Sequence, residues 1–257
     1  MRSARLGVLV LVFACAAGAA RAQTMVDQQL RLIDIHNLLL ELPPVQAPAA
    51  LRPLQVGLGV EAITVPPIDG ATGSKRQITA SDHTPLFPRP RLMIGLPAPE
   101  GFRAFAGIAY IPPVTIADVN TDYGAVEAGI AYAAGPLAVA LRGHVAHAFS
   151  KSPVTDPLTK DTLETFLYGA DVTAGRGFEA GWASFTPYAG LGVTHLHGRF
   201  RVTSDGVVLT SDAAVLALQA GLRLLVSQRW EAAVELDAYP GRLIHPNFRL
   251  AYLFDLR

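Results

Sequence analysis

The sequence predicts an all-β fold: an antiparallel up-and-down barrel of about ten strands, with eight or twelve strands left open, and a short N-terminal helix. Three observations carry this prediction. Apolar and polar residues alternate with a period of two beyond residue 54. The 257-residue chain is apolar, with a mean hydropathy of +0.32 and 16% charged residues, yet beyond residue 22 it contains no run of about 18 apolar residues, which a membrane-crossing helix needs. Long and short predicted connections alternate along the chain.

The first 22 residues have the features of an export signal. Arg2 and Arg5 form a basic start, residues 6–17 form an apolar stretch, and Ala20-Arg21-Ala22 offers the small residues that a signal peptidase requires. We predict cleavage after Ala22. The alternative is a lipoprotein signal, which would leave a lipidated Cys15 at the mature end.

Removal of this segment changes the charge and the cysteine content. The full chain has 21 Lys and Arg against 21 Asp and Glu; three arginines leave with the signal, so the mature chain has a formal charge of −3. This excludes a nucleic-acid binder driven by global charge. The single cysteine also leaves, which excludes disulfides and thiolate metal sites. No cofactor is expected, because Gly190-Leu191-Gly192 lacks the strand-to-helix context of a nucleotide-binding loop.

Residues 23–53 are predicted to form a periplasmic amphipathic helix and a Pro-rich linker. Leucine and isoleucine recur on a wide face over 24–42, Asp27 is a candidate cap, and Pro43-Pro44 stops the helix. The linker, 43–53, reads as stiff and extended. Two roles stay open for the helix: packing for stability, or acting as a periplasmic plug or partner-docking element.

The barrel is predicted over residues 54–257. The clearest strand is 213–226, where every second residue from Ala214 to Val226 is apolar. Several segments run to 10–14 residues, the length that tilted membrane strands need. The ten predicted strands are 54–65, 91–96, 102–111, 123–133, 137–149, 163–175, 185–200, 213–226, 230–239 and 247–256.

The predicted connections favour a membrane barrel over a soluble one. Residues 66–90, 112–122, 150–162 and 201–212 are long, whereas those between them are shorter, such as 134–136. Membrane barrels have short periplasmic turns and longer external loops. Aromatic residues also lie near the ends of apolar stripes, as an interfacial girdle requires. This predicted girdle comprises Phe102, Tyr110, Tyr132, Phe166, Tyr168 and Trp230.

With this alternation, the connection pattern and the final strand 247–257, the chain resembles the broad class of small bacterial outer-membrane β-barrel proteins. The class usually ends on an aromatic residue, whereas this chain ends on Arg257 and its last aromatic is Phe254. The resemblance implies a location in the Gram-negative outer membrane. It also implies outer-membrane lipid, lipopolysaccharide and the barrel-assembly machinery as partners.

If the apolar stripes face lipid, twelve charged residues face the lumen. Five arginines and seven carboxylates there predict a salt-bridged interior that closes the barrel, with a narrow polar pore as the alternative. The predicted lumen charge network comprises Glu61, Arg91, Arg103, Glu127, Arg142, Asp171, Arg223, Glu231, Glu235, Asp237, Arg249 and Asp255.

No motif assigns an enzymatic activity. His195 and His197 lie at i and i+2 on one strand face, a weak candidate metal pair. Carboxylates at the outer rim, such as Asp212, leave a rim hydrolase as one alternative. A soluble periplasmic barrel that binds an apolar ligand is another. The expected function is a non-enzymatic outer-membrane barrel with a structural, surface-binding or limited small-solute transport role.

Overall fold

The computed structural model describes residues 25–48, 51–63, 87–116, 119–156, 159–204 and 206–256. The predicted signal peptide (1–22) with its Cys15 lies outside the described residues, and so does most of the long connection after the first strand. The elements in chain order are α2 (Met25–Leu39), β1 (Gln55–Ile63), β2 (Phe87–Leu96), β3 (Phe102–Ile116), β4 (Val119–Ala134), β5 (Leu137–Asp156), β6 (Thr159–Arg176), β7 (Phe178–Ala180), β8 (Ala183–Arg201), β9 (Val208–Val226), β10 (Trp230–Tyr239) and β11 (Leu243–Asp255).

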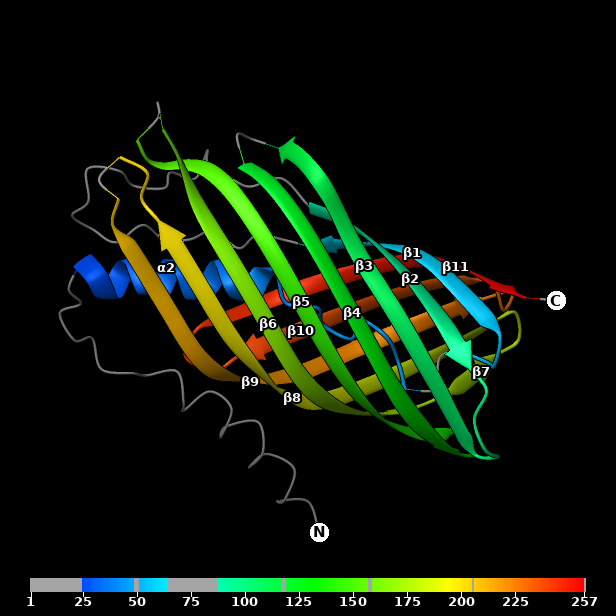
Figure 1. The fold of residues 1–257 in the computed structure, drawn as a ribbon. Helices are drawn as coiled ribbons and strands as arrows, with labels where there is room; N and C mark the ends of the chain where they lie inside the picture. The colour runs from blue at the N-terminus through cyan, green and yellow to red at the C-terminus, as the bar shows by residue number, and fades with distance from the viewer. Residues whose placement is uncertain are drawn as a thin grey trace, which may run out of the picture.

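The strands form one closed antiparallel barrel (Figure 1). Apart from β6 and β7, each strand pairs with its neighbours in sequence, and β1 pairs with β11 from Gln55–Asp255 to Ile63–Asn247. The pairing of β6 with β8 completes the ring. The three-residue β7 pairs with the start of β8, so β6 and β7 act as one barrel strand interrupted at Gly177. The structure therefore confirms the predicted all-β barrel of ten strands, with one short helix in the described residues.

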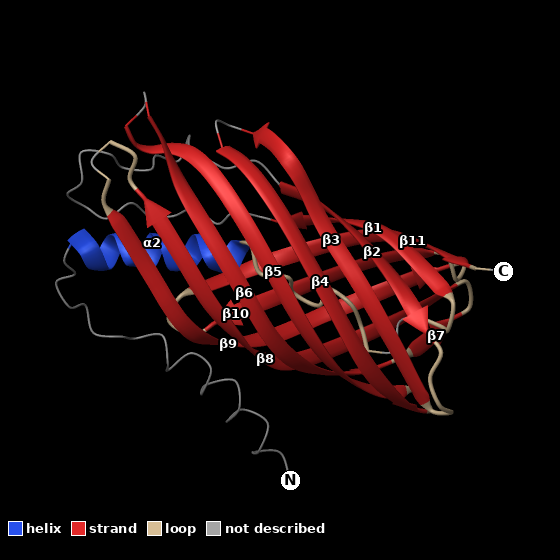
Figure 2. Cartoon of the chain, viewed as in Figure 1, coloured by secondary structure: helices blue, strands red, loops and turns tan. Residues whose placement is uncertain are grey.

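Three of the predicted long loops are extensions of strands. β3 and β4 are separated only by residues 117–118, and β5 and β6 only by 157–158, so two long hairpins stand where 112–122 and 150–162 were expected to be loops (Figure 2). The polar residues that suggested loops pair between the two neighbouring hairpins instead, as Thr121 Oγ1 of β4 does with Ser150 Oγ of β5 at 3.1 Å. A register shift between Ile111 and Val114 accommodates Pro112-Pro113. Likewise, residues 208–212 belong to β9.

The second strand begins four residues earlier than predicted, at Phe87 instead of residue 91. Pro88 and Pro90 made that stretch resemble a loop, because proline cannot donate a ladder hydrogen bond. Both prolines lie on the exposed face, in register with Ala62 and Val60. Arg89, between them, points inward and is fully buried.

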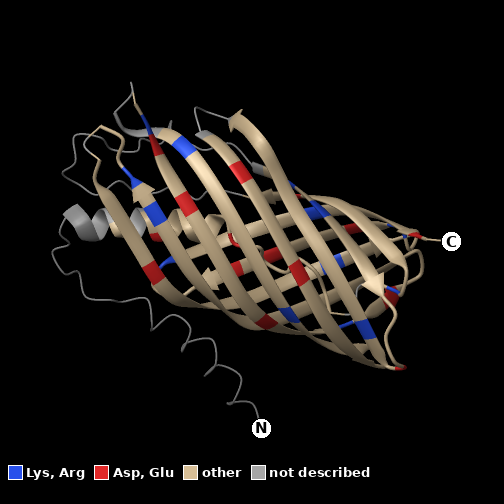
Figure 3. Ribbon diagram, in the orientation of Figure 1, with Lys and Arg blue, Asp and Glu red and all other residues tan. Residues whose placement is uncertain are grey.

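The two faces of the barrel differ in the way that a membrane barrel requires. The outward face carries exposed Leu, Val, Ile and aromatic side chains, among them Leu58 and Leu250 at 56% and 57% exposure. Charged positions are sparse along the strands (Figure 3). In the described residues, no helix is both long and apolar enough to span a bilayer.

The two rims are distinguished by their connections. The rim that carries the 97–101, 135–136 and 227–229 turns, together with the outer ends of β1 and β11, is called the turn rim here. The opposite rim, where the β3–β4 and β5–β6 hairpins end, is called the hairpin rim. Figure 1 shows α2 at the hairpin rim and the C-terminus at the turn rim.

Candidate functional site: the filled lumen

Residues 33–48 and Leu51 lie in the lumen, from the hairpin rim toward the turn rim. Near the hairpin rim, Asp34 of α2 accepts hydrogen bonds from Ser211 and Arg242. Near the turn rim, the carbonyl of Leu51 accepts a hydrogen bond from Arg103 at 3.4 Å. Residues 37–48 between these contacts are all buried. We call residues 33–48 together with Leu51 the lumen segment.

Two wall glycines make room for this segment at its ends. A Cβ on Gly95 would collide with the backbone carbonyl of Arg52, and Gly95 O accepts a hydrogen bond from Leu54 N at 2.8 Å. At the other end, a Cβ on Gly198 would collide with Asn37. Side chains at these positions would push the lumen segment away from the wall.

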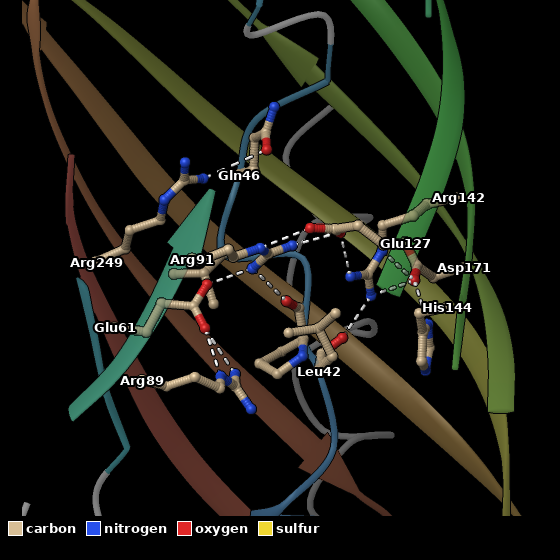
Figure 4. Close-up of polar contacts among 12 residues, drawn as sticks. Leu42, Gln46, Glu61, Arg89, Arg91, Glu127, Arg142, His144, Asp171 and Arg249 are labelled. Atoms are coloured by element: carbon tan, nitrogen blue, oxygen red, sulfur yellow. Dashed lines mark hydrogen bonds and ion pairs between the residues drawn. The ribbon is translucent and has the colours of Figure 1, made fainter. Parts of the chain in front are cut away.

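Three arginines of the wall donate to consecutive backbone carbonyls of the lumen segment (Figure 4). Arg89 Nη1 donates to Glu41 O at 2.6 Å, Arg142 Nη2 to Leu42 O at 2.8 Å, and Arg91 Nη1 to Pro43 O at 3.0 Å. The segment ends its helix at Leu39 and continues without regular secondary structure, so these buried carbonyls need partners from elsewhere. The arginines supply them.

The same arginines belong to a continuous ladder of ion pairs. Glu61 pairs with Arg89 at 2.7 Å and with Arg91. Arg91 Nε donates to Glu127 at 2.6 Å. All four side chains are at most 4% exposed, so each charge relies on its neighbours.

The ladder continues into the next two strands. Glu127 pairs with Arg142 at 3.0 Å, and Arg142 pairs with Asp171 at 2.6 Å. Strand β3 lies between Arg91 and Glu127 and contributes Gly107 there, where a Cβ would stand 2.6 Å from Glu127 Oε1. Because Gly107 has no side chain, Arg91 of β2 and Glu127 of β4 can pair across β3, which contributes no charged residue to the ladder at this point.

The opposite wall holds a smaller group. Glu231 of β10 pairs with Arg223 at 2.7 Å and with Arg249 at 3.4 Å. Arg249 Nη1 also donates to Gln46 Oε1 of the lumen segment at 3.3 Å. On β10, Glu235 Oε1 also accepts a hydrogen bond from Val45 N of the lumen segment at 3.0 Å.

Apolar layers lie on either side of the charged layer. Toward the hairpin rim, Leu38, Leu40 and Leu42 of the lumen segment pack against a buried cluster that includes Tyr123 and Leu196. Toward the turn rim, Leu51 packs with Met93, Phe105 and Leu253. The ion pairs are therefore shielded from both openings, which strengthens their mutual attraction.

The structure buries ten of the twelve predicted lumen charges: Glu61, Arg91, Glu127, Arg142, Asp171, Arg223, Glu231, Glu235, Asp237 and Arg249. The other two differ. Arg103 is half-buried beneath Leu51, and Asp255 is exposed at the turn rim, where it pairs with Arg52 at 3.3 Å. Asp255 is the last residue of β11, so its side chain lies beyond the sealed interior.

Sequence reasoning missed three buried charged residues, Glu41, Arg89 and Asp161, and the position of the lumen segment. Arg89 lay within the predicted connection 66–90, although its spacing of two from Arg91 was a usable signal. Glu41 lies in the lumen segment, where its carboxylate accepts hydrogen bonds from Thr194 and Tyr239. No local pattern in residues 25–53 indicated that they would enter the barrel.

The six predicted girdle aromatics are all exposed on the outer face, at 41–52%. Phe102, Tyr132 and Trp230 lie near the turn rim, and the rings of Phe102 and Tyr132 are tilted against each other with centroids 5.1 Å apart. Phe166 and Tyr110 lie closer to the hairpin rim, and Tyr168 lies near the middle of β6. Exposed aliphatic side chains lie between the aromatic residues of the two rims.

The two candidate metal-binding histidines lie on the outer face and share one carboxylate. His195 Nε2 and His197 Nδ1 are each 3.1 Å from a different oxygen of Asp212. Leu196, between them, is fully buried inside. Within the described ranges, no group of three or more His, Cys, Asp or Glu side chains is placed to hold a metal ion.

Scans against family models and against curated proteins find no match. Solved structures that are similar to this chain include the translocator domain of the autotransporter NalP from Neisseria meningitidis, at 14% identity and a TM-score of 0.48, over 92% of this chain and 100% of that one. LpxR from Salmonella typhimurium matches at 11% identity and a TM-score of 0.38, over 79% and 100% of the two chains. Ail, the attachment invasion locus protein of Yersinia pestis, matches at 12% and 0.35, over 78% and 97%. These are outer-membrane β-barrel proteins, and no activity, ligand or partner of theirs is carried over to this chain.

Proposed function

We propose that this protein is an outer-membrane barrel with a structural or surface-binding role, whose own lumen segment closes it to solutes. The observation that carries the proposal is the grip of Arg89, Arg91 and Arg142 on three consecutive carbonyls of that segment in the middle of the lumen. Each donor is charged and buried, which makes these hydrogen bonds stronger than neutral ones. A solute cannot cross this layer while the bonds hold.

The outer surface supports insertion in a membrane. Exposed aliphatic residues are bracketed by aromatic residues near both rims, which is the arrangement of barrels that face lipid. A soluble barrel for an apolar ligand would have the reverse arrangement, with its charges outside and an apolar cavity inside. Lipids of the outer membrane, including lipopolysaccharide, are therefore the partners that this surface fits. Insertion by the barrel-assembly machinery is part of the same proposal.

The connections support one orientation. Short turns face the periplasm in membrane barrels, so the turn rim would lie there and the hairpin rim outside. In this orientation α2 lies in the outer half of the barrel, which revises our expectation of a periplasmic helix. The β3–β4 and β5–β6 hairpins then form the surface available to binding partners.

Two measurements on the purified full chain test the proposal. A folded membrane barrel stays in detergent micelles and shows heat-modifiable migration on a gel, and the protein partitions with the outer membrane. A chain that stays dispersed without detergent and leaves the outer membrane contradicts the membrane assignment.

Closure is tested in planar bilayers. The wild-type chain is expected to give a flat current trace, whereas Leu42→Asp, which places a new carboxylate in the apolar layer around the lumen segment, is expected to give intermittent conductance. Leu58→Ala, on the lipid-facing surface, serves as the control and should stay closed. Steady conductance by the wild-type chain would rule out closure by the lumen segment.

A further inference from the structure

The buried interior of the barrel has more carboxylates than arginines. Apart from Asp161, whose Oδ1 accepts a hydrogen bond from Thr203 N near the hairpin rim, seven carboxylates of the lumen and its segment are at most 4% exposed, whereas five arginines are at most 7% exposed. The carboxylates are Glu41, Glu61, Glu127, Asp171, Glu231, Glu235 and Asp237, and the arginines are Arg89, Arg91, Arg142, Arg223 and Arg249. Buried His144 lies 3.7 Å from Glu41 and from Asp171, and the arginines alone leave two of the seven carboxylates uncompensated.

The deficit is concentrated on strand β10. Glu235 and Asp237 are both fully buried, and among the described residues neither lies within 4.0 Å of a Lys, Arg or His nitrogen. Each uses one oxygen in a hydrogen bond, with Val45 N for Glu235 and with Asn247 Nδ2 for Asp237. The second oxygens, Glu235 Oε2 and Asp237 Oδ1, have no hydrogen-bond partner in the described structure.

The hydroxyl of Tyr188 lies near the same pair of carboxylates. Tyr188 of β8, Gly221 of β9 and Glu235 of β10 lie in one register row. Tyr188 reaches across Gly221, where a Cβ would stand 2.5 Å from its hydroxyl, toward Glu235. Its side chain is 4% exposed, and its hydroxyl lacks a hydrogen bond of standard geometry within the described residues.

A buried ionised carboxylate is stable only when it is paired, when it coordinates a metal, or when it takes up a proton. Here two such carboxylates lie two residues apart on the inward face of β10, and the Tyr188 hydroxyl lies beside Glu235. Carboxylate oxygens are hard ligands, the kind that Ca²⁺ and Mg²⁺ prefer, and both ions complete their shells with water or neutral oxygens such as this hydroxyl. A divalent cation also supplies the two missing charges.

We propose that Glu235, Asp237 and the hydroxyl of Tyr188 bind one divalent metal cation with a preference for oxygen ligands. The site lies beside Val45 of the lumen segment, so the cation stabilises the arrangement in which the segment is in place. This inference goes beyond closure of the lumen, because a barrel without the cation can still be closed.

The test uses the full chain, purified in detergent and treated with EDTA. CaCl₂ or MgCl₂ is then titrated in, and bound metal is measured by calorimetry and by elemental analysis. We expect one cation per chain, with an increase in Tm of about 5 °C at a hundredfold excess over Kd. Glu235→Gln and Asp237→Asn should each weaken binding at least tenfold. The control Asp212→Asn, which removes a carboxylate from the outer face, should leave binding unchanged.

Two outcomes decide against the site. If the wild-type chain retains no cation and its Tm is the same in EDTA and in excess Ca²⁺ or Mg²⁺, the proposal fails and the two carboxyls are protonated instead. If Asp212→Asn abolishes binding and the β10 variants do not, the cation is bound on the outer face. If the β10 variants do not fold, the wild-type titration and Tyr188→Phe, which removes only the hydroxyl, decide the question.

Discussion

The two walls of the lumen hold the same segment by opposite means. The wall from β1 to β6 carries a ladder in which Glu61, Arg91, Glu127 and their neighbours alternate in sign, and it donates hydrogen bonds to backbone carbonyls. The wall from β9 to β11 has an excess of carboxylates, and Glu235 accepts a hydrogen bond from a backbone N–H. Because each wall satisfies a different kind of backbone group, the lumen segment is fixed in both position and direction.

The charges on the β1–β6 wall therefore compensate one another, whereas those on the β9–β11 wall do not. Removing one charged residue from a balanced ladder leaves a buried net charge uncompensated, whereas neutralising a residue of the acidic wall removes a repulsion. Substitutions on the two walls should therefore have unequal costs.

The largest effect is expected for Arg91→Ala. This change leaves the three ladder carboxylates Glu61, Glu127 and Asp171 with only Arg89 and Arg142, and leaves Pro43 O without its donor. Breaking a buried ion pair by removing one partner costs about 3–5 kcal/mol of unfolding free energy. Urea-induced unfolding in detergent, followed by the fluorescence of Trp182 and Trp230, measures it. Arg201→Ala, at an exposed position of β8, is the control; equal losses for both variants would contradict the ladder.

A smaller loss is expected for Gly107→Ala. The added methyl group would stand 2.6 Å from Glu127 Oε1, so the carboxylate has to shift within the ladder. Overpacking of this kind costs about 1–3 kcal/mol. Gly124→Ala is the matched control on the next strand, because nothing lies within 4 Å of its Cβ. The same unfolding assay should separate the two variants, and identical midpoints would show that the ladder does not need the glycine.

The smallest effect is expected on the acidic wall. In EDTA, Glu235→Gln removes a buried charge and keeps an oxygen that can accept the hydrogen bond from Val45 N, so its unfolding free energy should stay within about 1 kcal/mol of wild type. The comparison is made against Arg91→Ala under the same conditions. A loss as large as that of the arginine variant would mean that the two walls are equivalent.

Much of the barrel could be predicted because period-two alternation is a local property. Strand 230–239 matches β10 residue for residue, and the alternation also identified ten of the buried charges. The hairpin extensions of β3–β4 and β5–β6 could not be predicted this way. Above the membrane band a strand loses its apolar outer face, and the residues that stand there, such as exposed Asp122 and Lys151, have the composition of a loop.

The lumen segment could not be placed for a different reason. Its prolines and buried leucines suit either a linker or an interior strand, and its carbonyl partners lie 48 to 100 residues away in sequence. Arg89 is a milder case, because it lay within the predicted connection 66–90, whereas β2 begins at Phe87 and its prolines face outward. Long-range polar contacts, rather than local propensity, decide both positions.

The pairing of β1 with β11 has a consequence for assembly. The lumen segment runs directly into β1, and β11 is the last strand of the chain, so the ring of hydrogen bonds is completed at the junction between the two ends of the sheet. If β1 and β11 pair while the lumen segment is still outside, the segment can enter later only by passing into a barrel that is already closed. This step is avoided if β1 pairs with β11 only after the lumen segment is in place. Whether the barrel is filled or empty therefore depends on when β1 pairs with β11, because both forms have the same strand order.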